Sequence, residues 1–386
     1  MTEQELSFTP DWVSPPGDTI IDALEERDWT QSQFAERLGY TEKHVSLLIN
    51  AKVPITEESA QKLSRVIGST PEFWLRREAQ YRAQLIYVEE KERLQSWISW
   101  LDWLPVKDLM RQGAIVSRRL DNKNKPEIVK ELLQFFGVAS PDNWETCYAN
   151  KQVAFRRTRK DQSDVGAISA WLRLGELEAE KADVPKYNKA KFEKAVQEIR
   201  KLTVLSQSEF MPKLHQLCNE SGVVLGIVPA IPCAHTSGVA RWLSPHRALI
   251  QLSLYGKQND RFWFTFFHES AHILLHDKKD IFLDDSSKLS SQGDRLESQQ
   301  EDEANSWARE FLIPSEYDAE LPLLRSRESV IDFAQRVGIH EAIVVGRLQF
   351  DRLIEHNSNL NALKVSLTSD SQRQIAVFDE SSLFSL

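Results

Sequence analysis

The segment FTFFHESAHILLH contains two histidines and a glutamate whose spacing suits metal chemistry. His268 and His272 are four residues apart, so on a helix both imidazoles lie on one face and can reach one zinc ion. Glu269 lies beside them, where it can take a proton from metal-bound water. The alternative is an apolar core helix that contains the pattern by chance. Because burying these polar groups without a purpose is costly, we predict a zinc site with Glu269 as its catalytic base.

A third zinc ligand is expected in the segment EDEAN, at residues 301–305. The helix predicted there has an apolar stripe made of Ala304, Trp307, Ala308, Phe311 and Leu312. At about 100° per residue, Glu301 falls within the core-facing sector, whereas Glu303 lies at its edge. We therefore predict Glu301 as the third ligand and keep Glu303 as the alternative. His276 is one turn beyond the second histidine, and we expect it to orient its neighbours or to cap the helix end.

The elements that position these residues follow from the surrounding pattern. Apolar, β-branched runs predict strands at Val223–Val228, Ser237–Leu243 and Arg247–Ser253, with a hairpin turn between the last two. Helices are expected around His268 and Asn305, and the polar residues 284–300 between them predict a surface loop. This order indicates an α+β domain with a small sheet rather than a parallel wound sheet.

The segment WTQSQFAERLGYTEKHVSLLINAK near the N-terminus predicts two crossing helices. Thr30 and Gln33 have the spacing of a capping box, which starts a helix at Gln31. Thr41 can cap the second helix. The small residue, the turn glycine and the branched wedge that a helix-turn-helix requires are provided by Ala35, Gly39 and Val45.

The second helix of such a motif enters the major groove of DNA. The expected DNA contacts are Gln31, Thr41, Glu42, Lys43, His44, Ser46, Asn50 and Lys52. Acidic residues outnumber basic ones between Ile20 and Ile55, so non-specific affinity should be weak. We therefore expect specific binding to operator DNA as a homodimer, with a plain helical hairpin as the alternative.

The C-terminal part repeats this spacing. Ala334, Gly338 and Val344 match the positions of the small residue, the glycine and the wedge. Such helices often pack against a peptidase core, so packing is the favoured interpretation and DNA contact the alternative. The tail from Val365 alternates enough to predict one or two strands.

Composition and charge limit the class of protein. A chain of 386 residues indicates more than one domain, and a net charge of −9 means that any DNA contact must come from a local surface. Three cysteines without a C-x-x-C pair fit a reducing cytosol and exclude a disulfide framework. The start of the chain has no signal-peptide pattern, and the apolar run at Phe262–Phe267 is too short to cross a membrane. We expect a cytoplasmic protein without membrane contact.

Four regions are predicted. Residues 1–85 form a helix-turn-helix DNA-binding bundle, and residues 86–202 form a helical connecting region. Residues 203–325 form the zinc peptidase core, and residues 326–386 form a C-terminal helical segment and tail. The chain is therefore expected to be multidomain and mainly α, with α+β structure around the sheet.

The N-terminal motif belongs to a longer resemblance. The segment from about Phe8 to Leu85, including PPGDTIIDALEERDWTQSQFAERLG and STPEFWLRREAQYR, resembles HigA-type antitoxins of the Cro/C1-like repressor class. That resemblance implies a five-helix DNA-binding domain that works as a dimer on a palindromic operator, often that of its own promoter. It also makes a cognate toxin a candidate partner.

Most of the chain after Leu85 resembles the ImmA/IrrE family of zinc peptidases. HESAH, the helix from Glu301 to Pro314 and the segment SGVARWLSPHRALIQLS carry this resemblance. Many members have a glycine where this chain has Ala271, a change that keeps the residue small. The resemblance implies a zincin-like α+β peptidase domain with Glu301 as the third ligand. It also implies selective cleavage of a repressor or antitoxin, with the substrate strand paired to a sheet edge, for which RALIQLS is the candidate.

The leading hypothesis is therefore a DNA-binding, antitoxin-like regulator that carries a zinc-dependent endopeptidase. The alternative is a non-catalytic transcriptional regulator or antitoxin whose peptidase fold senses a ligand or binds a toxin. A zinc-stabilised scaffold without catalysis is a third hypothesis.

Overall fold

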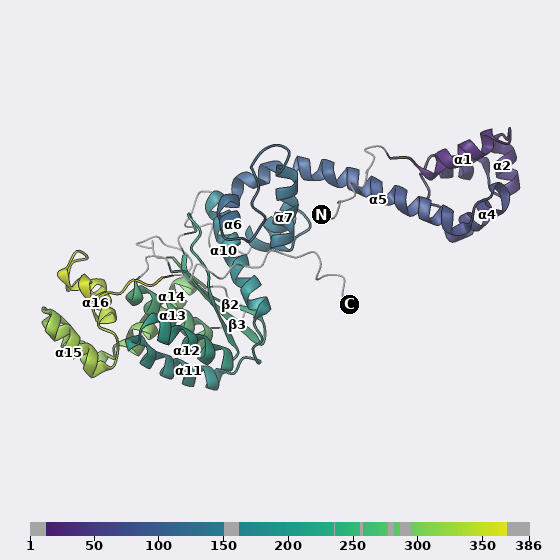
Figure 1. Ribbon diagram of the computed structural model, residues 1–386. Helices are drawn as coiled ribbons and strands as arrows, with labels where there is room; N and C mark the ends of the chain where they lie inside the picture. Colours follow the sequence, from purple (N-terminus) through teal and green to yellow (C-terminus); the bar gives the residue numbers. More distant parts are fainter. Residues whose placement is uncertain are drawn as a thin grey trace, which may run out of the picture. The chain divides into compact units, whose positions relative to one another are not determined.

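The computed structural model describes residues 13–149, 162–234, 236–254, 258–276, 282–285 and 295–368 (Figure 1). The chain divides into two compact units, Met1–Ile98 and Ser99–Leu386. The described residues are mainly helical, with one small sheet in the second unit, as the sequence predicts. The predicted domain boundary after residue 85 falls inside helix α5, which runs without a break from Pro71 to Ser96.

The first unit contains five helices in its described part. They are α1 (Pro16–Glu25), α2 (Gln31–Leu38), α3 (Glu42–Ile49), α4 (Glu57–Ile67) and α5. Their apolar faces meet in one core, whose largest fully buried side chains are Ile20, Phe34, Leu63 and Trp74. The expected five-helix bundle is therefore confirmed.

The local signals of the helix-turn-helix are confirmed in α2 and α3. The Gln33 amide donates to Thr30 Oγ1 (3.2 Å), and the Thr30 amide donates to Gln33 Oε1 (3.0 Å), which completes the capping box. Gly39 ends α2 with a φ of 67°. Thr41 Oγ1 then accepts a hydrogen bond from the His44 amide (3.2 Å) and caps α3. The two helices therefore begin and end where their capping residues predict.

The second unit begins with short helices and one long helix. These are η1 (Ile98–Trp103), α6 (Val106–Arg111), α7 (Lys125–Phe136), α8 (Pro141–Trp144), the π-helical η2 (Glu145–Ala149) and α10 (Gln162–Lys181). Aromatic rings pack between them, and Trp100 and Trp144 meet edge to face with centroids 5.8 Å apart. The chain continues through α11 (Lys189–Lys201), η3 (Leu202–Val204) and α12 (Gln207–Glu220).

The sheet has four strands in the order β1-β3-β2-β4. They are β1 (Val223–Ile227), β2 (Thr236–Ser244), β3 (Arg247–Leu252) and β4 (Phe282–Asp285). The strand pair β1–β3 is parallel, whereas β2 pairs antiparallel with both β3 and β4. The three predicted strands are confirmed, and the mixed sheet agrees with the α+β prediction.

Two predictions about this region are wrong. RALIQLS is β3, an inner strand with β1 on one side and β2 on the other, so its backbone cannot offer a free edge. The edges of the described sheet are β1 and β4. The polar stretch 284–300 is not a loop throughout, because its first two residues belong to β4 and its last six begin α14.

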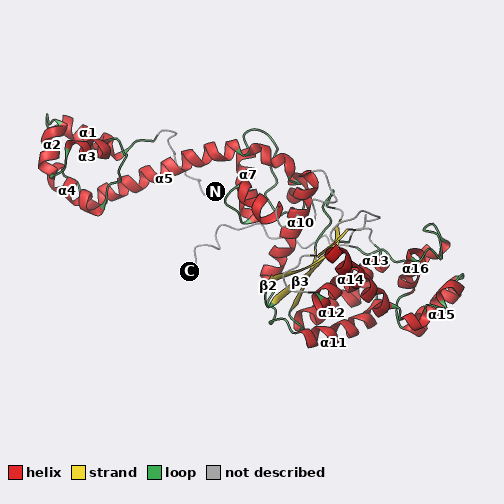
Figure 2. Ribbon diagram, turned by 180° about the vertical axis from the view of Figure 1, so that it is seen from behind, coloured by secondary structure: helices red, strands yellow, loops and turns green. Residues whose placement is uncertain are grey.

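Helices cover both faces of the sheet (Figure 2). On one face, α10 meets polar groups: Arg241 Nη2 donates to the Leu172 carbonyl, and Gln251 Nε2 donates to the Trp171 carbonyl. Residues of the other face, such as Ala240 and Ile250, join the core that α11, α12 and α13 (Asn259–Leu275) complete. One face of the sheet is therefore hydrogen-bonded to α10, and the other face packs against α11, α12 and α13.

The remaining helices are α14 (Arg295–Leu312), η4 (Ser315–Tyr317), η5 (Leu321–Leu323), α15 (Arg327–Val337), α16 (Glu341–Phe350) and η6 (Asn359–Leu363). After η6 the chain returns to the start of α13, where the Asn259 amide donates to the Val365 carbonyl (2.9 Å). Of the strands predicted in the tail, an isolated bridge joins Ser366 to Gln258, and residues 369–386 lie outside the described part. No helix among the described residues is long and apolar enough to cross a membrane.

Candidate metal centre

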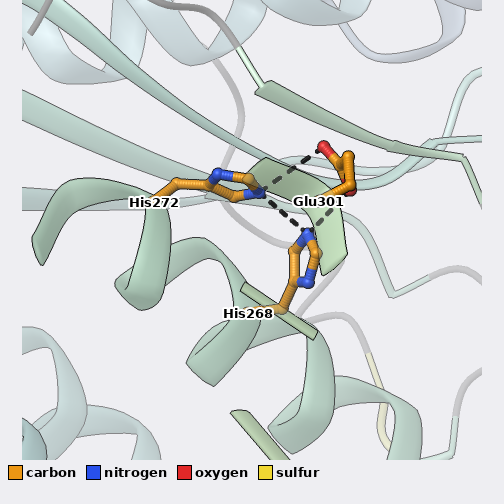
Figure 3. A group of neighbouring side chains, drawn as sticks. All are labelled: His268, His272 and Glu301. Carbon is orange, nitrogen blue, oxygen red and sulfur yellow. Dashed lines mark hydrogen bonds and ion pairs between the residues drawn. The ribbon is translucent and has the colours of Figure 1, made fainter. Parts of the chain in front are cut away.

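Two histidines of α13 and one glutamate of α14 converge in the second unit (Figure 3). The Nε2 atoms of His268 and His272 are 3.0 Å apart. The Glu301 carboxylate faces both rings, with Oε2 3.4 Å from His268 Nε2 and Oε1 3.5 Å from His272 Nε2. The spacing of the motif and the helical-wheel choice of Glu301 therefore lead to one cluster of three donor atoms.

This donor set fits a zinc ion. Ligand distances of about 2.0–2.1 Å in a tetrahedral site place the ligand atoms about 3.4 Å from one another. The three donor atoms of the cluster lie within 4.8 Å of one another, and both histidines are buried. Burial, together with the neighbouring His268 and His276, lowers the pKa of His272 to about 2. The imidazole is therefore neutral at physiological pH, which is the form that binds a metal.

Packing of α13 against α14 brings the ligands together. Phe311 of α14 stacks on Trp307 (4.7 Å between centroids) and contacts Phe267 of α13 (5.2 Å). At the far end of α14, the half-buried side chain of Arg200 donates to the carbonyls of Phe311 and Leu312. These bonds satisfy carbonyls that have no partner within the helix, and they hold the helix that carries Glu301.

Glu303, the alternative ligand, lies on a different side of α14. Its Oε2 atom is 3.3 Å from His276 Nε2, and its Oε1 atom accepts a hydrogen bond from Gln299 (2.9 Å). His276 Nδ1 in turn is 2.9 Å from His272 Nδ1. Glu303 therefore contacts the outer ring nitrogen of a histidine that itself contacts His272. This arrangement agrees with the expectation that His276 orients a neighbour.

Glu269 follows the first metal-ligand candidate in α13, and its side chain faces the sheet. Its side chain is fully buried, and its carboxylate faces the β2 backbone at Gly238, where a Cβ atom would lie 2.7 Å from Glu269 Oε1. Gly238 was not among the residues predicted from the sequence. A glycine inside a strand pattern is a known sign of close backbone approach, and that signal could have identified it.

The predicted DNA-contact residues lie on one exposed part of the first unit. Gln31, Thr41, Glu42, Lys43, Ser46, Asn50 and Lys52 are exposed. His44 is half-buried and its ring lies 4.5 Å from that of Tyr40. Asn50 Nδ2 donates to the Ser46 carbonyl (2.7 Å), so this amide also caps the end of α3. The outer face of α3 is therefore accessible, with one of its polar groups engaged locally.

Comparison with known proteins identifies both parts. Residues 20–75 match the helix-turn-helix family model, and residues 229–349 match the model of the IrrE N-terminal-like domain, a peptidase family. The chain joins a helix-turn-helix domain to an IrrE N-terminal-like domain. The second match includes both histidines of the cluster and Glu301, so the candidate centre lies within the IrrE-like domain.

A curated relative supports the first assignment. Over 60 residues the chain is 40% identical to the uncharacterized HTH-type transcriptional regulator YddM of Escherichia coli (strain K12). The match covers 16% of this chain and 64% of YddM. The family model and a relative named as an HTH-type regulator therefore both match the first unit.

Proposed function

We propose that this chain is a DNA-binding regulator whose IrrE-like domain is a zinc-dependent endopeptidase. The observation that carries the proposal is the convergence of His268, His272 and Glu301, with the buried carboxylate of Glu269 next to the first histidine. Two imidazoles and one carboxylate are the ligand set of many catalytic zinc sites, which keep a position open for water or substrate.

In this proposal, each residue of the centre has a role in metal binding or proton transfer. His268, His272 and Glu301 hold zinc, and His276 orients the ring of His272. A bound zinc ion supplies Lewis acidity, which makes water a nucleophile near neutral pH. The Glu269 carboxylate accepts the proton of the attacking water and later delivers it to the leaving amine.

The substrate is proposed to be an extended segment of a repressor or antitoxin, paired with the edge strand β4. Two observations support this edge. β4 is the outer neighbour of β2, and β2 carries Gly238 in front of Glu269. A strand added at β4 would therefore lie on the side of the sheet nearest the catalytic carboxylate. Its main-chain groups would supply affinity, and pockets for its side chains would supply selectivity.

The helix-turn-helix domain is proposed to bind operator DNA as a homodimer in the cytoplasm. The exposed residues of α3 and the start of α2 support this, with Lys43 and Lys52 as phosphate contacts and Ser46 facing base edges. The resemblance to antitoxins makes the operator of its own promoter the first candidate and a cognate toxin a candidate partner.

The first test is the metal content of the purified protein, measured by elemental analysis. We expect about one zinc ion per chain in the wild type and almost none in the His268→Ala variant. Glu303→Gln tests the alternative ligand, and it should keep the metal because the Glu303 carboxylate contacts His276 rather than the three donor atoms. Wild-type protein that takes up no zinc would refute the peptidase proposal.

The second test separates catalysis from a non-catalytic regulator that senses a ligand or binds a toxin. Cells expressing the wild type or Glu269→Gln are compared by labelling of new protein N-termini. We expect a small set of cleavage products that depends on Glu269, because the variant keeps the zinc ligands and loses the base. Identical sets of N-termini, with zinc retained in both proteins, would favour the non-catalytic regulator.

A further inference from the structure

Gly238 of β2 lies directly against the catalytic helix. A Cβ atom at this position would be 2.5 Å from Thr265 Cγ2, 2.7 Å from Glu269 Oε1 and 3.0 Å from Glu269 Cγ. Side-chain atoms do not approach one another this closely, so any residue larger than glycine must displace Thr265, Glu269 or the strand. Thr265 and Glu269 are one turn apart on α13, and both are buried.

The need for glycine here is steric rather than conformational. The backbone of Gly238 is not in the left-handed region, where glycine is favoured for its φ angle, as it is at Gly39 or Gly338. Gly238 instead pairs with Leu252 of β3 as an ordinary strand residue. The absence of a side chain is therefore what the position requires.

The strand is also held in place at this point. Its pairing with β4 shifts register between Thr236 and Gly238, as in a β-bulge. Ser253, directly after β3, holds the shifted segment: its Oγ donates to the Thr236 carbonyl (2.6 Å), and its amide donates to the Ser237 carbonyl (2.8 Å). Because these bonds limit movement of β2, a side chain added at Gly238 would displace residues of α13 rather than the strand.

We propose that Gly238 is a positioning residue for Glu269. The bare backbone of β2 forms the wall against which the Glu269 carboxylate is fixed, and this placement keeps the base beside the metal ligands of the same helix. The catalytic part of this inference rests on the proposed peptidase function. The steric part concerns two residues of this chain and does not depend on turnover.

Gly226 of β1 offers a matched control. It is a glycine in the same sheet, but a Cβ atom there would be 3.3 Å from the end of the Glu178 side chain and 3.7 Å from Leu249 Cδ1. The terminal carboxylate of a long side chain can move by a few tenths of an ångström. Gly226→Ala therefore reports the general effect of replacing a strand glycine, without the contact to Glu269.

The test is a double-mutant cycle on the zinc-free full-length protein. Gly238→Ala is compared in the wild-type background and in a Glu269→Ala background by calorimetric unfolding of the IrrE-like domain. We expect Gly238→Ala to lower the unfolding temperature by about 5 °C more when Glu269 is present, because overpacking is relieved when the carboxylate is removed. Equal losses in the two backgrounds would overturn the proposal.

A second cycle with Thr265→Ser in every member removes the methyl group that the new Cβ would also meet. This second cycle can still be measured if Gly238→Ala alone fails to fold. The coupling between Gly238 and Glu269 should persist in this background. Its disappearance would show that Thr265 accounts for the whole effect and would overturn the proposal.

Two further measurements, zinc content and cleavage products, relate the double-mutant cycle to function. Gly238→Ala should retain about one zinc ion per chain by elemental analysis, because the three ligands are untouched, and loss of zinc would contradict a role specific to Glu269. The Glu269-dependent cleavage products should fall at least about tenfold in Gly238→Ala and remain in Gly226→Ala, since a displacement of about 1 Å can cost about a hundredfold in rate. If Glu269→Gln changes no cleavage product, the peptidase proposal fails while the stability cycle still tests the positioning.

Discussion

The helix pairs α2–α3 and α15–α16 share one turn geometry and differ in what their second helices face. The small residue, glycine and wedge are Ala35, Gly39 and Val45 in the first pair and Ala334, Gly338 and Val344 in the second. Both glycines end a helix in the left-handed region, with φ angles of 67° and 75°. Both wedge valines are fully buried. The shared spacing therefore produces the same local structure twice.

Even the caps of the second helices correspond. Thr41 Oγ1 accepts a hydrogen bond from the amide three residues on, and His340 Nδ1 accepts one from the amide two residues on. A histidine thus stands where the N-terminal pair has a threonine. The first turn of each helix is satisfied by a side chain, so capping does not distinguish the two pairs.

The pairs differ on the face away from their own first helices. When the turn glycines are aligned, the exposed Lys43, Ser46 and Asn50 correspond to Ala342, Val345 and Gln349. These three residues of α16 are 0%, 0% and 7% exposed. The helix packs against α13, the helix of the metal-ligand candidates, and its face is therefore occupied. The spacing of the small residue, the glycine and the valine therefore predicts how two helices cross. The residues on the outer face of the second helix determine whether that face is accessible to DNA.

The largest expected effect comes from placing the same charge on both outer faces. Val345→Lys puts an unpaired ammonium group into the core of the IrrE-like domain and should destabilise it by about 4 kcal/mol or more. Ser46→Lys is the matched change on α3 and should alter stability by at most about 0.5 kcal/mol. Hydrogen exchange resolved by helix measures the two effects in the full chain.

The opposite outcome would change the assignment of the C-terminal helix pair. A small effect of Val345→Lys, similar to that of Ser46→Lys, would mean that the outer face of α16 is accessible. DNA contact by the C-terminal pair would then be the better interpretation of its spacing.

A smaller effect is expected on DNA binding. In the Lys43→Ala and Lys52→Ala variants, affinity for a duplex that carries the DNA upstream of the chain's own coding sequence should fall. The dependence of log affinity on log salt concentration should lose about one unit of slope for each phosphate contact removed. Arg336→Ala is the control, because it removes a positive charge at the position of the second pair that corresponds to Arg37. Fluorescence anisotropy at several salt concentrations measures the slope, and an equal loss in the control would remove the distinction between the pairs.

Features that depend on neighbours in sequence were predictable. The capping box at Thr30, the turn at Gly39 and the three strands β1, β2 and β3 follow from local patterns, and the structure confirms them. The geometric cluster of the two histidines with Glu301 also follows, because a helical wheel places each side chain on the face that the other helix packs against. Helical periodicity predicts which face a side chain lies on for residues within one or two turns of each other.

Features that depend on distant parts of the chain were not predictable in this way. β3 is an inner strand because β1 pairs with it in parallel. The sequence of RALIQLS alone does not predict this pairing. The second half of β4 lies in a polar stretch whose composition is typical of a loop, and pairing with β2 determines its structure. The close approach of Gly238 to Glu269 joins a strand residue to a helix residue 31 positions later in the sequence. Strand order and steric contact between elements are tertiary properties.

The smallest expected effect tests the feature that the two pairs share. Gly39→Ala and Gly338→Ala each place a Cβ atom where no other atom lies within 4 Å, so the penalty comes only from the left-handed backbone. Each change should destabilise its own pair by about 1 kcal/mol and leave the other pair unchanged. Hydrogen exchange of α2–α3 and of α15–α16 in both variants measures this. Similar losses of stability would show that the turn has the same structural role in both helix pairs. The difference between the pairs would then lie in their outer faces. A loss at Gly338 several times larger than at Gly39 would mean that the turn itself supports the packing of α16 on α13.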